Sequence, residues 1–433
     1  MKKMRVCFIA LMVLVLLPSA LFAGGETEKS GEVTKKVTVT QWSFPLTGDA
    51  KDEFTGMQAA FHEANPNIEV NIEFFPWQNR LERFMTAIAG RQAPDTGYLN
   101  GDYFPPLADQ GGLLPLDEYL SDDFVNDIKH PYTWRGHIYI LPILETSMPI
   151  FYNTEIYKQA GLDPDKPPET WDDFFSYCEA IKKNTDAWPW TQPLLTYDAY
   201  RSHKWLWQAG GDYVSADGSK IGLDTPEGLE AMTAIQKLFQ NYVNPAEYAL
   251  APGEALPIFG SSKAAMAVNE QHWIKRLRDA YPEVGAVTKL GHVLKNKRRL
   301  GHGTVAGYCI FAQSKQPAET AEWIKFMTSG DNVAEFCSRL WFISPQKSQD
   351  AKVAANINDP AFDQAVKESA YAGLFHHPIK GSVDQIYLPN IQQVAMGRMD
   401  PKEALKTSAE ELQKILDNYI KRVGPAPYSS AAR

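Results

Sequence analysis

The chain has 433 residues, which is more than a single hydrophobic core usually organises, so two domains are expected. It is 44% hydrophobic and 22% charged, as in ordinary globular proteins. A net charge of -9 argues against nucleic acid as a partner, because phosphate backbones attract basic surfaces. The aromatic content of 12% fits either a large core or a ligand that stacks on rings.

The first 23 residues have the pattern of a signal peptide. A basic "MKKMR" precedes the apolar "VCFIALMVLVLL", and "PSALFA" offers a cleavage point near Ala23. Gly24 follows where a lipoprotein needs a cysteine, which predicts export without a lipid anchor. Residues 24–35 carry Gly, Ser, Glu and Lys with no apolar pattern, so we expect a flexible tether to the folded protein.

Strand and helix patterns alternate from residue 37 to residue 100. The predicted strands are "KVTVTQWSF", "NIEVNIEFF" and "TGYLN", and the predicted helices are "DEFTGMQAAFHEANP" and "RLERFMTAIAG". Pro66 stops the first helix and Gly90 the second. This order predicts an α/β fold with a parallel or mixed sheet flanked by helices.

Polar and aromatic residues follow these strands. Trp42, Trp77 and Asp102 each stand just beyond a predicted strand, and ligands of such sheets bind at the carboxyl ends of the strands. Asp102 is then placed to accept hydrogen bonds from a ligand. The alternative is that Asn100 to Asp102 is only a turn that caps the next helix.

The stretch "RGHIYILPILETSMPIFYNTEIYKQAG" predicts a passage between domains. It is a long apolar strand interrupted by Pro142 and Pro149, followed by a helix that ends at Gly161. A strand that continues past a proline can leave one sheet and enter another. We therefore expect the chain to cross from one domain to the other here.

Residues 170–226 carry sequence signals for two helix starts and one turn. Thr170 is the predicted N-cap of "WDDFFSYCEAIKK", and Thr225 precedes a proline at the first position of the next long helix. Between the two helices, Asp217 and Gly218 form the predicted turn of a hairpin.

Searches for catalytic, metal and redox motifs give little. Cys178, Cys309 and Cys337 are predicted to be buried free thiols, although a bridge between the last two stays open. His292 and His302 lack partners at metal-ligand spacing, so no cofactor is expected. A pair of glycosidase carboxylates can be neither picked out nor excluded in a chain this acidic.

Six segments occur in an order that is similar to a known family. They resemble the landmarks of extracellular solute-binding proteins of ATP-binding-cassette sugar importers, the maltose-binding-like family 1, over nearly the whole mature chain. The segments are "FHEANPNIEVNIEF", "AIAGRQAPDTGYLNGDYFPPLADQGGLLPLDEYL", "YILPILETSMPIFYNTEIYKQAGLDPDKPPETWDDF", "WQAGGDYVSADGSKIGLDTPEGLEA", "FGSSKAAMAVNEQHW" and "MGRMDPKEALKTSAEEL".

The resemblance implies a two-domain periplasmic-binding-protein fold of type II, with mixed sheets flanked by helices and a hinge of three crossings. The expected lobes are 36–146 plus 305–343, and 147–304 plus 344–433. Such proteins close on a saccharide and deliver it to the permease subunits of the transporter. We accordingly expect a periplasmic monomer that binds a mono- or oligosaccharide and catalyses nothing.

The resemblance also indicates where ligand contacts lie. Asp102 matches a carboxylate that holds sugar hydroxyls, and Glu145, or Thr146 beside it, lies at the expected hinge. Trp273 matches a ring that reaches the cleft, with Glu270 nearby. The full set of predicted contacts is Trp42, Trp77, Asp102, Glu145, Tyr200, Trp205, Glu270, Trp273 and Tyr387.

Within that set the choice among neighbours stays open. Tyr200 and Trp205 are preferred over His203 and Trp207 in "YDAYRSHKWLWQAGG", where helical spacing turns at least two of the four inward. Tyr387 shares its segment with Asp384, an equally weak candidate.

One stretch departs from the family pattern. The basic run Lys295 to Arg299 stands where relatives carry a proline-rich strand end. It predicts either a solvated loop or a cationic rim for an acidic sugar or glycerol phosphodiester. A further alternative, from another class, is an exported carbohydrate-active enzyme such as a glycosidase or lyase.

Overall fold

The computed structural model describes most of the chain. The described residues are 36–46, 54–101, 103–130, 132–194, 200–250, 254–426 and 428. The predicted signal peptide and tether lie outside them, and so does Asp102. Within the described residues, no helix is long and apolar enough to span a membrane.

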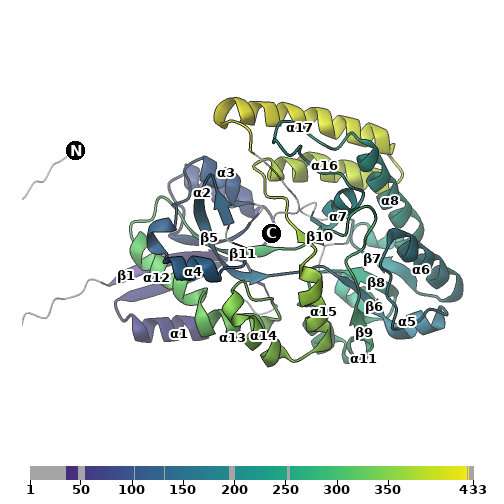
Figure 1. The fold of residues 1–433 in the computed structure, drawn as a ribbon, viewed down its shortest axis with the longest axis horizontal. Coiled ribbons are helices and arrows are strands. Elements are labelled where there is room, and N and C mark those ends of the chain that lie inside the picture. The colour runs from purple at the N-terminus through teal and green to yellow at the C-terminus, as the bar shows by residue number, and fades with distance from the viewer. Residues whose placement is uncertain are drawn as a thin grey trace, which may run out of the picture. The chain divides into compact units, whose positions relative to one another are not determined.

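A six-stranded mixed sheet forms in the order β2-β1-β3-β11-β5-β4 (Figure 1). Its strands are β1 (Val37–Ser43), β2 (Ile68–Phe74), β3 (Thr96–Asn100), β4 (Tyr132–Trp134), β5 (His137–Glu145) and β11 (Val305–Ile310). β1 pairs in parallel with β2 and β3, as the alternating strands and helices predict. β11 is antiparallel to both β3 and β5, which makes the sheet mixed.

β11 comes from far along the chain and completes the middle of this sheet. All six of its residues are buried. Gly307 allows the strand to approach β5, because a Cβ there would lie 1.9 Å from the carbonyl oxygen of Leu141. The register between the two strands shifts at the same place, between Ala306 and Gly307.

A second sheet has four strands in the order β7-β8-β6-β9. They are β6 (Ile150–Asn153), β7 (Trp188–Thr191), β8 (Ala264–Val268) and β9 (Thr288–Leu290). The chain passes from β5 of the first sheet to β6 of the second within the four residues 146–149. The predicted passage near Pro142 and Pro149 is thereby confirmed as a change of sheet.

Helices cover both sheets, and a two-stranded sheet, β10 (Gly301–His302) with β12 (Ala372–Gly373), lies apart from them. Before β5 the helices are α1 (Thr55–Ala64), α2 (Arg80–Ala89), α3 (Phe104–Asp109) and α4 (Asp122–Asp127). Between β6 and β11 they are α5 (Thr154–Gln159), α6 (Trp171–Asn184), α7 (Tyr200–Gln208), α8 (Pro226–Tyr242), α9 (Ala255–Gly260), α10 (Trp273–Ala280) and α11 (Pro282–Ala286). After β11 they are α12 (Pro317–Met327), α13 (Gly330–Leu340), α14 (Asp350–Ile357), α15 (Pro360–Ser369), α16 (Lys380–Ala395) and α17 (Pro401–Val423).

Local sequence signals explain where several helices begin. Thr170 and Asp173 form a reciprocal capping box at the start of α6, and Thr225 accepts from the backbone N–H of Gly228 at the start of α8. The predicted turn at residues 217–218 is present, bracketed by a single antiparallel bridge between Val214 and Ile221.

The three cysteines of the described chain are free and buried, as predicted. Cys309 lies in β11 and Cys337 in α13, and no bridge joins them. Burial raises the pKa of the Cys309 thiol to about 12, so the thiol is protonated and inert at neutral pH.

The predicted boundaries of the two lobes are consistent with the two sheets, but the sheets do not determine them. Every strand of the first sheet falls within 36–146 or 305–343, and every strand of the second within 147–304. The boundaries themselves, and their use as a hinge, stay predictions.

Candidate functional site

Three chain segments run side by side where the two sheets meet. Glu145 exchanges both backbone hydrogen bonds with Ile343, at 2.9 and 3.0 Å. The Thr146 N–H donates to the Thr304 carbonyl at 2.7 Å, and the Thr304 N–H donates back to the Thr146 hydroxyl at 2.9 Å. The three boundaries between the expected lobes, after residues 146, 304 and 343, fall in these three segments.

Gln271 holds the same junction from the side of β8. Its carbonyl oxygen accepts from the Ser147 N–H at 2.9 Å, and its amide donates to the Trp341 carbonyl at 3.1 Å. Glu270, the predicted neighbour, is half-buried next to it. Glu145 is buried, and its carboxylate lies 3.7 Å from His130 Nε2.

A buried polar cluster joins the turn after β3 to the first turn of α16. Lys380 Nζ donates to Asp384 Oδ2 at 2.5 Å and to the Tyr103 hydroxyl at 3.0 Å. The Tyr103 hydroxyl in turn donates to Asp384 Oδ2 at 3.0 Å. The Lys380 side chain is only 1% exposed and that of Asp384 10%. We call these three residues the polar cluster.

An arginine and a histidine lie close to Tyr103 of the polar cluster or to the neighbouring Gly101. The Arg80 guanidinium at the start of α2 lies 4.3 Å from the centroid of the Tyr103 ring. The same guanidinium carbon lies 5.4 Å from the centroid of the Trp77 ring. His376 Nδ1 makes a 2.8 Å hydrogen bond with the Gly101 carbonyl, so the segment before α16 is tied to the end of β3 a second time.

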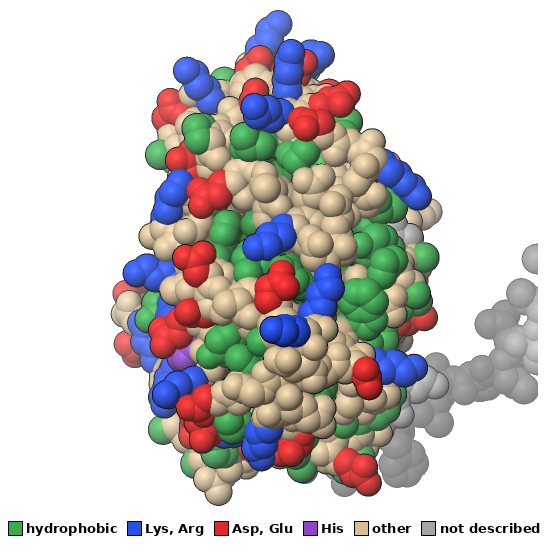
Figure 2. All heavy atoms as spheres, turned by 90° about the vertical axis from the view of Figure 1, so that its right-hand side faces the viewer, with side chains coloured by type: hydrophobic (Ala, Val, Ile, Leu, Met, Phe, Trp, Pro, Cys, Tyr) green, Lys and Arg blue, Asp and Glu red, His purple; other side chains and the backbone are tan. Residues whose placement is uncertain are grey.

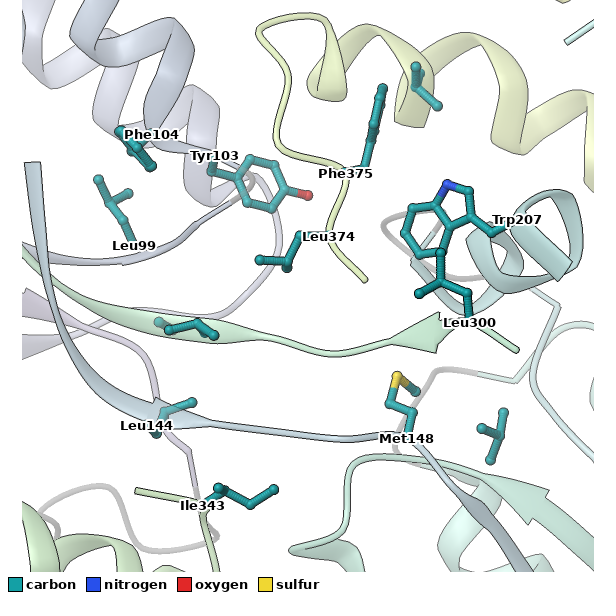
Figure 3. Packing of buried hydrophobic residues seen from close by; sticks show 14 of the residues in the cluster. Leu99, Tyr103, Phe104, Leu144, Met148, Trp207, Leu300, Ile343, Leu374 and Phe375 are labelled. Atoms are coloured by element: carbon teal, nitrogen blue, oxygen red, sulfur yellow. The ribbon is translucent and has the colours of Figure 1, made fainter. Parts of the chain in front are cut away.

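Behind the polar cluster lies a set of packed rings that we call the aromatic cage. Its rings come from α7, from the segments around residues 213 and 375, from α16 and from the chain end. They are His203, Trp207, Tyr213, Phe375, His377, Tyr387 and Tyr428. Each is buried. Figure 3 shows the Tyr103 hydroxyl pointing toward Phe375, with Trp207 beyond it.

The end of the chain contributes one wall of the aromatic cage. After α17 the chain turns back, and the Tyr428 ring stands edge-on to Phe375, with centroids 5.3 Å apart. Ala426 packs against the turn at residue 218, where a Cβ on Gly218 would lie 2.1 Å from the Ala426 carbonyl oxygen. Gly218 also has a φ of +75°, a backbone conformation that favours glycine. Both the close approach of Ala426 and the backbone angle therefore require glycine at this position.

The two aromatic residues predicted beside the first sheet have different surroundings. Trp42 is half-buried and packs on Phe75 and Phe84, at centroid distances of 4.8 and 5.9 Å. Trp77 is half-buried, and its indole donates to the Pro45 carbonyl at 2.8 Å. Trp77 therefore stands beside the polar cluster, whereas Trp42 belongs to the packing against α2.

Three of the aromatic residues predicted after residue 147, Trp205, Trp273 and Tyr387, are deeply buried. Trp205 lies 5.0 Å from the Trp171 ring centroid, and Trp273 lies 5.1 Å from Phe151 in a separate core cluster under β8. Tyr387 belongs to the aromatic cage. The structure thus gives Trp205 and Trp273 packing partners away from the polar cluster, which favours a core role for both.

The structure does not describe the side chains of two predicted ligand contacts. Asp102 is outside the described residues, and the side chain of Tyr200, at the start of α7, is not described. Tyr103 and Lys380 were not among the contacts predicted from the sequence. Lys380 precedes Asp384 by four residues on one helix, and this spacing was a usable signal for an ion pair.

Basic side chains of the run Lys295 to Arg299 form ion pairs with neighbouring carboxylates. Lys297 lies 3.0 Å from Glu230, and Arg299 lies 2.8 Å from Glu169. Arg298 pairs with Asp212 at 3.3 Å. On the face drawn in Figure 2, basic and acidic side chains are likewise interspersed. These pairs support the surface-loop interpretation over a cationic rim.

The protein should lose stability on mild acidification through His377. Burial lowers the pKa of His377 to about 4 from 6.5, with the neighbouring His376 as a lesser cause. Its Nδ1 also accepts from the Ile379 N–H at 3.4 Å, which requires the unprotonated form. The stability is complete above pH 6.5 and falls as the pH drops from 6.5 to 4, because only the unfolded chain takes up the proton there. The loss from this residue is about 3 kcal/mol.

Urea unfolding at pH 7, 5.5 and 4.5 measures this loss. Carboxylates also contribute to acid unfolding, so the comparison is with His377→Phe, which keeps a ring in the same space. Its stability should fall less steeply between pH 6.5 and 4. Parallel profiles for the two proteins would show that His377 is not the titrating group.

No group of three or more His, Cys, Asp or Glu in the described chain is arranged to hold a metal ion. What the junction offers is a buried ion pair, stacked rings and neutral hydrogen-bonding groups, an arrangement suited to holding a polar solute. The model of bacterial extracellular solute-binding proteins matches residues 47–334, more than half of the chain, and the protein belongs to this family.

Individual proteins with similar sequences or structures are also solute-binding proteins. The chain is 26% identical over 382 residues to a maltotriose-binding protein of Pyrococcus abyssi, covering 83% of this chain and 76% of that one. It is 31% identical over 197 residues, 43% of each protein, to an arabinooligosaccharide-binding protein of Bacillus subtilis. A Thermotoga lettingae transporter solute-binding protein, solved with alpha-D-tagatose, superposes with a TM-score of 0.78 at 21% identity, covering 88% of this chain and 99% of that one. The fold is that of the two-domain periplasmic binding proteins.

Proposed function

We propose that this protein is the substrate-binding component of an ATP-binding-cassette importer for a neutral saccharide. It is exported, binds the sugar at the junction of the two sheets and delivers it to membrane permease subunits. It holds its ligand without changing it chemically. The observation that carries the proposal is the polar cluster, which is buried between β3 and α16 and has Arg80 and Trp77 close by.

The chemistry of this junction suits a sugar. Carboxylate, amide and phenol groups bind hydroxyl rims, and Trp and Tyr rings bury the apolar C–H faces of a sugar at low entropic cost. The names of the relatives support the same class of ligand, since one is called maltotriose-binding and another arabinooligosaccharide-binding. We assign ligand contacts to Trp77, Tyr103 and Asp384, and keep Asp102 as a further contact.

The charge of the junction favours a neutral ligand. The charge of Lys380 is balanced by Asp384. In the basic run, which suggested an acidic ligand, Lys297 and Arg299 form ion pairs with Glu230 and Glu169. A buried anionic group on the ligand would need a cation of its own, because an unpaired charge is costly to bury.

A thermal-shift and calorimetric screen tests this function. The panel holds maltotriose, raffinose, arabinotriose and tagatose, with trigalacturonic acid as the acidic comparison. A neutral sugar that binds only the folded state should raise the melting temperature and titrate to saturation at one site. The acidic sugar should have no effect.

The proposal fails if the screen gives the reverse order, or if none of the neutral sugars binds. Catalysis is tested in the same tubes by assaying for new reducing ends after prolonged incubation. Sugar that is recovered intact after saturable binding supports a binding protein, whereas steady release of reducing ends would assign the chain to a carbohydrate-active enzyme.

A further inference from the structure

The chain end folds back after α17 and is buried against the rest of the protein. Gly424, with a φ of +82°, ends the helix, and beyond it Ala426 and Tyr428 are only 2% and 6% exposed. The Tyr428 N–H donates to the Ala216 carbonyl at 3.2 Å. The last residues of a domain are usually poorly ordered unless contacts hold them in place, so the burial of this chain end needs a physical explanation.

The chain end packs on the segment that leads into α16. The Tyr428 ring lies edge-on to the rings of Phe375 and His377, at centroid distances of 5.3 and 6.0 Å. The Phe375 and His377 rings are themselves stacked, with centroids 6.1 Å apart. One ring of the chain end therefore contacts two residues of this segment.

His376, between these two residues, contacts the first sheet and α3 instead. Its ring lies 4.9 Å from that of Phe104 in α3 and 5.5 Å from that of Trp134 in β4, measured between centroids. Its Nδ1 makes the 2.8 Å hydrogen bond with the Gly101 carbonyl at the end of β3. Consecutive residues of one short segment thus contact the chain end and the region of β3 and α3.

The same segment supports the polar cluster. The His377 carbonyl accepts from the Lys380 N–H at 3.0 Å, and His377 Nδ1 accepts from the Ile379 N–H at 3.4 Å. From this backbone the Lys380 ammonium group reaches Tyr103 and Asp384. A shift of His377 would therefore move the backbone that carries Lys380. Displacements of about 1 Å in the residues that support a site are enough to impair it.

We propose that Tyr428 is a positioning residue for ligand binding. Its ring fixes the segment from Phe375 to Lys380, and this segment in turn holds the polar cluster in the geometry that binds the ligand. Tyr428 acts through the segment and does not itself touch the ligand. The inference rests on the proposed function and extends it, since it makes the affinity of that site depend on the chain end.

The test separates positioning from a general contribution to stability. Tyr428→Ala removes the ring, whereas Tyr428→Phe keeps it and should behave as the wild type does. Tyr157→Ala is the control, because Tyr157 is also buried but packs on Tyr152 in β6 and Tyr177 in α6. Both alanine variants should lower the melting temperature, so the melting temperature alone does not identify a positioning residue.

Amide hydrogen exchange of the ligand-free proteins over residues 375–384 reports on the segment itself. Tyr428→Ala should accelerate exchange there by about tenfold or more, because the local opening that exposes the Lys380 N–H becomes easier. Tyr157→Ala and Tyr428→Phe should leave exchange in these residues at the wild-type rate.

Calorimetric titration with the panel sugar that the wild type binds gives the effect on affinity. Tyr428→Ala should weaken binding by roughly 3- to 10-fold, the size of the coupling between residues of one contact network, while the other two variants should bind as the wild type does. Gly218→Ala reaches the chain end by a second route, should Tyr428→Ala fail to fold. Its Cβ would lie 2.1 Å from the Ala426 carbonyl oxygen, so it should displace the chain end and change exchange and affinity in the same direction.

Wild-type exchange over residues 375–384 in the variants of Tyr428 and Gly218 would overturn the positioning role. So would accelerated exchange with unchanged affinity, or an equal loss of affinity in Tyr428→Ala and Tyr157→Ala. The exchange measurement needs no sugar, so the two proposals can fail separately. A wild type that binds no panel sugar would remove the proposed function, while exchange would still decide whether Tyr428 fixes the segment.

Discussion

Replacing Trp273 with alanine should lower the free energy of unfolding by about 3–5 kcal/mol, the usual cost of truncating a buried aromatic side chain. Trp273 is 3% exposed, stands edge-on to Phe151 and packs on Phe259 at a centroid distance of 5.6 Å. Because these contacts are internal to the core under β8, affinity for sugar should stay near that of the wild type.

Trp77→Ala is the matched comparison for this variant. Trp77 is half-buried beside Arg80 and the polar cluster, so its removal should weaken sugar binding more and stability less than the removal of Trp273 does. Urea unfolding and calorimetric titration of both variants give the answer. If the Trp273→Ala protein is stable but no longer binds sugar, Trp273 is a ligand contact, as the sequence predicted.

Lys380→Met should be about as damaging, with an expected loss of about 3–5 kcal/mol of stability. The substitution removes the ammonium group that lies 2.5 Å from the buried Asp384 carboxylate. Removing one member of a buried ion pair costs more than replacing both members with apolar side chains. The double variant Lys380→Met with Asp384→Leu should therefore recover much of the loss, although its sugar affinity should remain low. Chemical denaturation of the three proteins measures each step.

An exposed ion pair of similar length provides the control. Lys275 and Asp279 on α10 are 2.6 Å apart, and their side chains are 41% and 63% exposed. Lys275→Met should change stability by less than about 1 kcal/mol, because water already screens the pair. A similar small effect at Lys380 would mean that the polar cluster contributes little to the folded state.

Local sequence patterns predicted the elements of the first half of the chain well. The strand and helix periods, the proline after α1 and the caps at Thr170 and Thr225 are short-range signals, and the structure has the elements they specify. The placement of β11 between β3 and β5 is different in kind. It pairs Ala306 with both Asn100 and Leu144, which lie far away in the sequence. The family resemblance indicated only that the chain returns to the first lobe near residue 305.

The candidate site was harder to predict for the same reason. The aromatic cage gathers rings from residues 203 to 428, and no periodicity relates Tyr213 to Phe375 or Tyr428. In "YRSHKWLWQ" the helix presents both tryptophans to packed interiors, Trp205 to α6 and Trp207 to the cage. Composition identifies such residues as aromatic, but only the fold decides which of them can touch a ligand.

The central position of β11 has a practical consequence for protein engineering. A fragment that ends before residue 305 leaves β3 and β5 with unpaired inner edges, and exposed edges of this kind invite aggregation. The first sheet therefore cannot be produced alone as one contiguous piece. The same dependence makes the segment before β11 a natural breakpoint for a split protein, in which residues 305–433 added as a second fragment would supply both β11 and the α16 half of the polar cluster.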